Sequence, residues 1–170
     1  MGKQGAFTLV EMMITLTVMT IFVTLAVQGY YALIQNNRSV SLTNNFVSSF
    51  QFARTEAVLR GQTVSVCPAG DTTYTSCGGV SDWDQGWIVF VDPDSNGVLA
   101  SDTDRLRIHE DPGSGTRVES DESHINYDSN GFVVNGSGDY TLSAAGCSGT
   151  AGRTVNINNT GRLSVSAINC

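Results

Sequence analysis

Residues 7–27 read FTLVEMMITLTVMTIFVTLAV, and this stretch decides the fold of the N-terminal part of the chain. At 1.5 Å per residue a helix of this run is about 31 Å long, enough to cross a hydrocarbon core of about 30 Å. A cleaved secretory signal is the alternative, with Thr24 and Ala26 as small residues near a cut, but its apolar core normally has only about 7–15 residues. The length therefore predicts a transmembrane helix.

Glu11 is the one acidic residue of this apolar run. A carboxylate inside a membrane helix costs about 2–3 kcal/mol on insertion scales and needs a partner. If a short leader of residues 1–6 is removed, Phe7 becomes the N-terminus and its α-amino group supplies a cation. Within one helix that amine is poorly placed for Glu11, so pairing between neighbouring copies is more natural. The pattern predicts helix-on-helix assembly in the membrane.

The helical pattern continues beyond the apolar run. Apolar residues recur at intervals of three and four in Leu42, Phe46, Phe50, Ala53 and Ala57. Such a stripe is typical of an amphipathic helix and predicts packing against a sheet. Residues 36–38, two Asn and an Arg, mark the exit from the membrane, and Gly61 is placed to cap the helix. A single helix over residues 7–60 would be about 80 Å long.

Past Gly61 the hydrophobic period becomes that of β-strands. The candidate strands are TVSVC at 63–67, WIVFV at 87–91, RLRIH at 105–109, FVV at 132–134, TVNIN at 154–158 and RLSVS at 162–166. Clusters of Asp, Ser, Asn and Gly at 94–97 and 129–131 predict hairpin turns between strands. The expected fold class is α+β, with an antiparallel meander packed on the long helix.

Composition and motifs exclude several classes of function. The 170 residues carry 9 basic and 16 acidic side chains, a net charge of −7, which argues against a protein whose main role is to cover phosphates. Lys3 is the only lysine, so lysine-based Schiff-base or P-loop chemistry is excluded further along the chain. Asp82 and Asp84 form a carboxylate pair without a catalytic partner, and no hydrolase or nucleotide motif is present. We therefore expect no enzymatic activity.

The segment GAFTLVEMM at 5–13 resembles the type IV prepilin signature: a short basic leader, a small residue, then Phe, Thr, Leu, Val and a Glu at the fifth mature position. The resemblance implies that prepilin peptidase cleaves between Ala6 and Phe7, that Phe7 is N-methylated, and that subunits polymerise through the hydrophobic helix, with Glu11 as the assembly residue. The family nearly always has Gly before the cut. Cleavage after Gly5 is the alternative, and it would place Glu11 at the sixth position.

The order CPAGDTTYTSC at 67–77, DWDQGWIVFVDPDSNG at 82–97 and DRLRIHE at 104–110 is similar to the GspH/FimT-type minor pilins and pseudopilins. This resemblance implies the type IV pilin fold, a long N-terminal helix packed on an antiparallel sheet with a loop-rich C-terminal region. The implied segments are a leader at 1–6, a transmembrane and polymerisation helix at 7–27, its amphipathic continuation at 28–61, and a β-rich globular domain at 62–170.

Family resemblance also implies location, partners and role. The protein would cross the inner membrane once, with its N-terminus cytoplasmic and its globular domain periplasmic, and then enter a fibre at the cell surface. Its partners would be other minor pilins and the major pilin through the N-terminal helix, prepilin peptidase, and the inner-membrane assembly platform. We expect a minor pilin that primes or tips a type IV pilus. A type II secretion pseudopilin and a tip receptor that binds DNA remain as alternatives.

Four cysteines, all on the side expected outside the cytoplasm, favour disulfides: Cys67, Cys77, Cys147 and Cys170. Three pairings are possible, and loop length favours Cys67 with Cys77 and Cys147 with Cys170. A zinc site is the rival interpretation, but no CxxC spacing is present, and His109 and His124 are not near a thiol in the sequence.

Residues 92–97 reproduce the first half of a calcium loop, with Asp92, Asp94 and Asn96 at alternate positions. The twelfth position is Thr103, where the motif requires Glu, although acidic residues flank it on both sides. Weak calcium binding is therefore one interpretation, and a simple hairpin turn is the favoured one. No other cofactor is expected.

Some relatives in the resembling family are DNA receptors with a Gly-Arg-x-Arg motif near the C-terminus. This chain has Arg153 and Arg162 after glycines, but neither is followed by the second Arg. Two isolated guanidinium groups on an acidic protein would neutralise few phosphates, so DNA contact is the less favoured interpretation. Solvent-facing arginines at strand ends are the favoured one.

Overall fold

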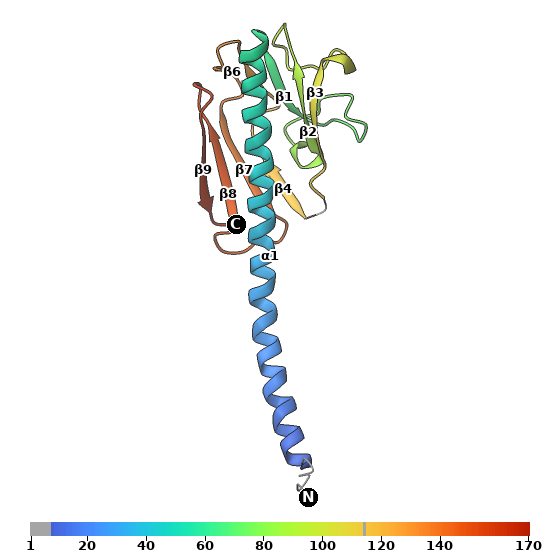
Figure 1. Cartoon of the computed structure of the whole chain (residues 1–170), viewed down its shortest axis with the longest axis vertical. Coiled ribbons are helices and arrows are strands. Elements are labelled where there is room, and N and C mark those ends of the chain that lie inside the picture. The colour runs from blue at the N-terminus through green and yellow to red at the C-terminus, as the bar shows by residue number, and fades with distance from the viewer. Residues whose placement is uncertain (1–7, 114) are drawn as a thin grey trace, which may run out of the picture. The chain divides into compact units, whose positions relative to one another are not determined.

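One long helix, α1, spans Leu9–Arg60 (Figure 1). The computed structural model describes residues 8–113 and 115–170, without the side chains of residues 25–28. Thr8 precedes the helix, and its Oγ1 accepts a hydrogen bond from the Glu11 N–H (3.3 Å), as an N-cap residue does. At the other end Gly61 has a φ of +65° and the Gln62 N–H donates to the Ala57 carbonyl (3.3 Å). This is the glycine cap that the sequence predicts.

The chain divides into two units, Met1–Ile34 and Gln35–Cys170. The first contains the apolar half of α1, and the second contains the rest of α1 and every described strand. The strands and short 3₁₀ helices are β1 (Val64–Pro68), η1 (Trp83–Gln85), β2 (Gly86–Val91), η2 (Asp102–Asp104), β3 (Arg105–Glu110), β4 (Thr116–Glu119), β5 (Ile125–Tyr127), β6 (Val133–Asn135), β7 (Gly138–Ala144), β8 (Gly152–Ile157) and β9 (Leu163–Ile168).

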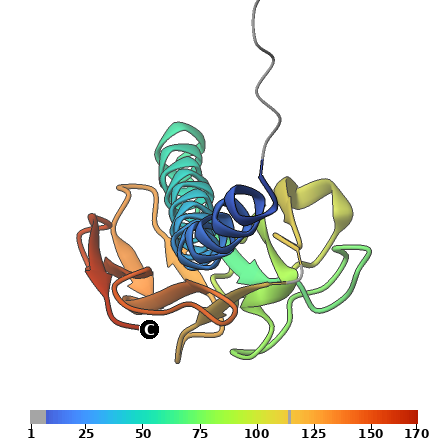
Figure 2. The same cartoon turned by 90° about the horizontal axis from the view of Figure 1, so that it is seen from below.

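The strands form two antiparallel sheets. The first has the order β3-β2-β1-β5-β6, and the second has the order β4-β7-β8-β9. Seen end on, both sheets lie against the same side of the C-terminal half of α1 (Figure 2). The chain therefore builds a helix layer and a layer of two sheets, which is an α+β fold of the expected class.

An aromatic cluster fills the space between the helix and the sheets. Phe46 and Phe50 of α1 are stacked with ring centroids 4.1 Å apart, and Phe46 lies 5.3 Å from Trp87 and 5.2 Å from Tyr140. Trp83 stands edge-on to Tyr140 at 5.4 Å, and all five side chains are fully buried. Burial of such rings supplies much of the stability of a domain of this size. The predicted apolar stripe of α1 is confirmed, since each of its members is buried.

The predicted single meander is wrong, because the chain changes sheets three times. After β3 it enters the second sheet with β4, returns to the first for β5 and β6, and goes back for β7 to β9. Each predicted strand is found within about two residues. The strands that the sequence did not predict are β4, β5 and β7. β4 and β5 have only four and three residues, and β7 begins with Gly and Asp, which are uncommon in strands. Their partners are set by tertiary packing and not by local pattern.

Two turns of one type lie at the ends of β5 and β8. The Asp128 Oδ1 accepts hydrogen bonds from the N–H groups of Asn130 and Phe132 (both 2.9 Å), and the Asn158 Oδ1 accepts from the Arg162 N–H (3.0 Å). Burial raises the pKa of Asp128, but the backbone donors of Phe132 and Asn130 outweigh it and hold that pKa below its ordinary value. The turn at 129–131 is the hairpin that the sequence predicts.

Arg54 of α1 joins these two turns. Its Nε donates to the Gly131 carbonyl (2.9 Å) and its Nη2 donates to the Thr160 carbonyl (3.0 Å). The Val133 N–H also donates to the Asn159 carbonyl (2.9 Å), so the end of the first sheet is tied directly to the β8–β9 turn. One helical side chain thus contacts a turn of each sheet.

Candidate functional site

The described surface of the N-terminal unit is apolar on every side of the helix. All side chains described from residue 8 to residue 24 are exposed, including Leu9, Met13 and Phe22, the last with 68% of its surface accessible. The helix is long and apolar enough to cross a membrane. An apolar surface of this extent requires a partner outside the chain, either lipid or other helices.

Threonine hydroxyls within this helix are satisfied internally. The hydroxyls of Thr15, Thr20 and Thr24 each donate to a backbone carbonyl of the preceding turn at 2.8–2.9 Å. A hydroxyl without such an acceptor would carry a desolvation cost in hydrocarbon. The polar residues of the span are therefore compatible with an apolar environment.

Glu11 is the exception among these polar groups. It lies in the first turn of α1, its side chain is exposed, and it forms no ion pair with a described residue. Its carboxylate is favoured there by the positive end of the helix dipole. The predicted cleavage bond between Ala6 and Phe7, and the Phe7 amine, lie outside the described residues. Within the described residues the Glu11 carboxylate is therefore an exposed acidic group without an ionic partner.

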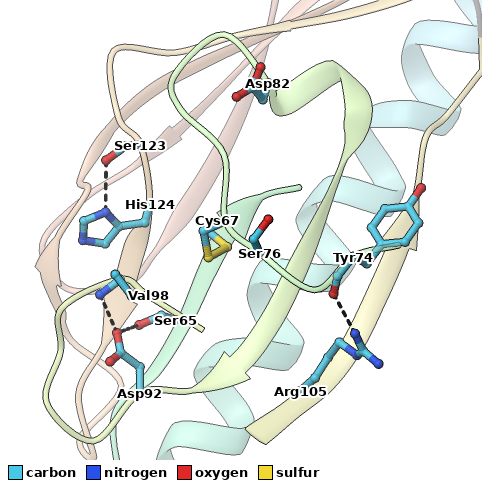
Figure 3. The surroundings of a disulfide bond; sticks show 12 residues. Ser65, Cys67, Tyr74, Ser76, Asp82, Asp92, Val98, Arg105, Ser123 and His124 are labelled. Carbon is cyan, nitrogen blue, oxygen red and sulfur yellow. Dashed lines mark hydrogen bonds between the residues drawn. A yellow bond between two sulfur atoms is a disulfide. The ribbon is translucent and has the colours of Figure 1, made fainter. Parts of the chain in front are cut away.

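The four cysteines form two disulfides, with the pairing that loop length favours. Cys67 is bonded to Cys77 (Cα–Cα 5.6 Å) and Cys147 to Cys170 (Cα–Cα 5.8 Å). Cys67 lies in β1 and is fully buried, and Figure 3 shows its disulfide. The zinc interpretation requires free thiolates as ligands, and the two disulfides leave none of the four cysteines free.

The loop inside the first disulfide has a dense hydrogen-bond network. The Asp71 carboxylate accepts from the hydroxyls of Ser76 and Thr73, and these bonds hold its pKa well below the ordinary value. Tyr74 has a φ of +57°, its carbonyl accepts from the Arg105 guanidinium (2.6 Å), and its hydroxyl accepts from the Asp111 N–H (2.9 Å). The loop is therefore fixed against β3, as Figure 3 shows for Tyr74 and Arg105.

The calcium-like segment is held by hydrogen bonds from the protein itself. The buried Asp92 carboxylate accepts from the Ser65 hydroxyl (2.7 Å) and from the N–H groups of Gly97 (2.9 Å) and Asn96 (3.2 Å). Asp94 accepts from the Asn96 side-chain amide (2.7 Å). Among the described residues no group of three or more His, Cys, Asp or Glu is arranged to hold a metal. The geometry is that of a turn stabilised by an aspartate.

Arg153 and Arg162 are not brought together as a basic patch. The Arg153 guanidinium donates to the carbonyls of Thr150 (2.9 Å) and Gly152 (2.7 Å) and to the Asn36 side chain of α1 (2.7 Å). Arg153 pairs with Ala167 in β9, whereas Arg162 precedes β9 at the opposite end of that strand. Arg153 is therefore a structural residue that ties β8 to the helix, and Arg162 is an isolated exposed cation.

His109 on β3 is stacked on Trp87, with ring centroids 4.1 Å apart. Burial lowers the pKa of His109 below its ordinary value, and the positive charge of Arg107 on the same strand lowers it further. The neutral imidazole is therefore the form that the fold stabilises. No local pattern indicates this contact, because the two residues belong to different strands.

Asp82, one of the two acidic residues around Trp83, also has a structural role. Its carboxylate accepts from the Gly79 N–H (2.7 Å) and from the Gln85 side-chain amide (3.1 Å), which fixes the entry to η1. Trp83 in turn donates its indole N–H to the Glu122 carbonyl (2.7 Å). The carboxylate thus orders a turn beneath the aromatic cluster.

Two segments of the chain match models of known protein families. Residues 1–27 match the prokaryotic N-terminal methylation motif. Residues 42–161 match the family described as type II transport protein GspH. The chain belongs to the GspH family. The resemblance drawn from GAFTLVEMM and from the blocks at 67–110 is confirmed, and β9 of this GspH-family chain lies beyond the matched segment.

Two solved structures have a fold similar to that of the GspH-family chain. Both are crystal forms of the type IV minor pilin FimU of Pseudomonas aeruginosa strain PAO1. The P21 form is 22% identical with a TM-score of 0.55, over 76% of this chain and 89% of that chain. The P65 form is 23% identical with a TM-score of 0.51, over 74% and 90%. The similarity shows a shared type IV pilin fold. A comparison with curated protein sequences finds no match.

Proposed function

We propose that this GspH-family protein is a minor pilin of a type IV pilus and acts as a structural priming or tip subunit in fibre assembly. The observation that carries the proposal is the contrast within α1. Its first half has an exposed apolar surface with one unpaired carboxylate among the described residues, and its second half buries an apolar stripe in its own unit. Such a chain combines a domain that has its own buried core with a helix whose apolar surface is still exposed. A subunit that assembles through helix packing requires this combination.

In this proposal the helix crosses the inner membrane with its N-terminus in the cytoplasm and the sheet unit in the periplasm. Prepilin peptidase removes residues 1–6, and the methylated amine of Phe7 pairs with Glu11 of an adjacent subunit. In a low-dielectric environment a carboxylate and an ammonium attract strongly, and each removes the other's desolvation cost. The pair therefore sets the axial register between neighbours. Other minor pilins, the major pilin and the assembly platform are the partners.

A type II secretion pseudopilin is the second candidate, and the family description favours it. The same helix and carboxylate would serve that fibre equally well, because both candidates need lateral packing of apolar helices. A tip receptor for DNA has less support, since the Arg153 guanidinium is already bound to two carbonyls and to Asn36 and the chain has a net charge of −7.

The deciding experiment measures surface fibres and secretion in the same cultures. In a strain that lacks this gene, the major pilin in sheared surface pili is quantified together with type II secreted protein. Loss of pili with normal secretion supports the proposed role. Normal pili with failed secretion would move the protein to the secretion pseudopilus, and normal levels of both would leave a receptor role as the better explanation.

The registration role of Glu11 has a sharper test. Glu11→Ala should leave the protein folded and inserted in the membrane but reduce its amount in sheared fibres by at least about tenfold, as expected for loss of one partner of a buried pair. Thr15→Ala is the matched control, because that hydroxyl bonds only to the Met12 carbonyl of its own helix. Wild-type recovery of the Glu11 variant in fibres would contradict the role.

A further inference from the structure

The two open sheets have four edge strands, β3 and β6 in the first and β4 and β9 in the second. An edge strand presents unpaired N–H and C=O groups that can pair with another chain. Proteins usually protect such edges with charged residues, prolines, bulges, short strands or covering loops.

The edge at β3 is protected in three ways. Its six residues, RLRIHE, include Arg105, Arg107 and Glu110. The pairing with β2 has an irregularity between Val89 and Phe90. The disulfide loop covers one side, through the bonds from Arg105 and Asp111 to Tyr74 (2.6 and 2.9 Å; Figure 3).

The edges at β4 and β6 are short. β4 has four residues, two of which, Arg117 and Glu119, form an ion pair at 2.6 Å. β6 has three residues, and the N–H of its first residue, Val133, donates to the Asn159 carbonyl in the β8–β9 turn. Neither strand offers a long unprotected ladder.

The edge at β9 has none of these protections. Its six residues, LSVSAI, contain no charge and no proline, and four of them are exposed. Within the described chain its backbone forms hydrogen bonds only to β8. Figure 1 shows the strand at the outer side of the second sheet. β9 is also outside the segment that matches the GspH family, which ends at residue 161.

The turn before β9 determines which backbone groups point outward. The Asn158 N–H donates to the Arg162 carbonyl (3.2 Å), so these two residues form a hydrogen-bonded pair. Pairs alternate along an antiparallel ladder, and the register continues as Ile157 with Leu163 and Asn156 with Ser164. The N–H and C=O groups of Leu163, Val165 and Ala167 therefore point away from β8.

The side chains of the same three residues lie on the helix-facing side of the sheet. Val165 is opposite Val155 and Leu163 is opposite Ile157, and residues that are directly opposite share a face. Val155 and Ile157 are buried, whereas Val165 has 51% of its surface exposed. One more strand beside β9 would extend this apolar face and cover Val165.

The strand is also held in place at its far end. The Cys147–Cys170 disulfide and a hydrogen bond from the Cys170 N–H to the Gly149 carbonyl (2.9 Å) fix the segment that follows β9. An edge that is already ordered loses little conformational entropy when a partner strand binds. β9 is thus a preorganised acceptor.

We propose that β9 is an acceptor edge to which an extended, uncharged strand from the globular domain of a different, neighbouring pilin subunit adds. The proposal rests on the assembly role proposed above. Two copies joined β9 to β9 would form a two-fold interface that closes as a dimer, whereas a growing fibre needs contacts between unlike surfaces. Backbone hydrogen bonds would supply the affinity, and Val165 would select an apolar partner side chain.

Proline substitutions test the outward N–H groups directly. The pair Val165→Pro and Ala167→Pro removes two outward donors and leaves the bonds to β8 intact, which an edge strand tolerates. The matched control, Val165→Thr with Ala167→Ser, keeps both N–H groups. We expect the proline variant to fall at least about tenfold in sheared fibres and the control to remain near wild type, with both full-length proteins forming their disulfides and unfolding near the wild-type temperature in detergent.

A second pair of variants covers the case in which proline disturbs the fold. Ser164→Lys with Ser166→Lys places charges on the exposed edge, and Ser129→Lys places one in an exposed turn. Reduced fibre content for the edge pair alone supports the proposal, because edge lysines oppose strand pairing. Wild-type fibre content for the edge pair or for a folded proline variant overturns it. A β9-dependent dimer of the wild-type chain in detergent would also overturn it, in favour of a second copy.

Failure of this proposal and failure of the assembly role give different results. If the gene deletion leaves fibres and secretion unchanged, the assembly role itself fails. If the deletion abolishes fibres and the β9 variants restore them fully, the assembly role holds and the acceptor edge does not.

Discussion

The two halves of α1 use apolar residues in different ways. From Leu9 to Val23 the large apolar side chains are exposed on all sides, whereas from Leu42 to Ala57 they form one buried stripe. A stripe with helical period indicates a partner within the same chain, and an apolar surface on all sides indicates a partner outside it. The pattern along one helix thus separates what holds the subunit together from what holds subunits to each other.

Removing one aromatic ring from each half should show the largest difference. Phe46→Ala opens a cavity in the cluster with Phe50 and Trp87 and should lower the free energy of unfolding by about 3–5 kcal/mol. Phe22→Ala, in the exposed half, should leave it unchanged. Urea unfolding of the full chain in detergent, followed by tryptophan fluorescence, measures this, because both tryptophans lie in the sheet unit. Equal effects of the two variants would contradict the division.

Substitution of Arg54 tests how much the contacts between the second half of α1 and the turns of the two sheets contribute to stability. Arg54→Ala removes the bonds to the Gly131 and Thr160 carbonyls (2.9 and 3.0 Å) and should lower the free energy of unfolding by about 2 kcal/mol. Arg60→Ala is the control on the same half. It removes only an exposed ion pair with Glu56 and should cost less than about 0.5 kcal/mol. The same urea titration applies, and a similar cost for both variants would exclude the joining role.

Substitution of Ser39 tests whether the part of α1 that packs on the sheets already begins at this residue. The Ser39 hydroxyl is fully buried and accepts a hydrogen bond from the Ala144 N–H (3.0 Å). Ser39→Ala leaves that buried donor without an acceptor and should lower the free energy of unfolding by about 1 kcal/mol. Ser41→Ala, at an exposed position, should be neutral or slightly stabilising because Ala has the higher helix propensity. If the two variants behave alike, the contact at Ser39 contributes nothing.

Acidification should lower the stability of the sheet unit only, and this effect should be smaller than those of the substitutions above. The folded pKa of His109 is lowered, so the unfolded chain binds the proton more tightly. The contribution of His109 to stability is present above the unfolded pKa of about 6.5 and is lost as the pH falls below it. The urea midpoint should fall between about pH 7 and pH 5.5, and less so in His109→Phe. The far-UV helical signal of the full chain should stay constant over this range. An identical pH dependence in the variant would exclude His109 as the cause.

Local pattern was sufficient for the helix, its glycine cap and most strands, because each depends on residues close in sequence. The calcium-like spacing at Asp92 and the strand-end position of Arg153 were not sufficient to predict the roles of these two residues. Asp92 is bonded by Ser65, 27 residues away, and Arg153 by Asn36, 117 residues away. A local sequence pattern cannot reveal hydrogen bonds between residues that are so far apart in the chain. The division into two sheets has the same origin, since β4, β5 and β7 acquire partners only in the folded chain.

The contact between Arg54 and Thr160 also sets an order for synthesis, because these residues are 106 positions apart. At about 5–20 residues per second, roughly 5–20 s separate the emergence of the helical stripe from that of the hairpin that covers it. During this interval Phe46 and Phe50 have only part of their final cover. Until the last hairpin emerges, this uncovered apolar stripe is a surface through which unfinished chains can aggregate.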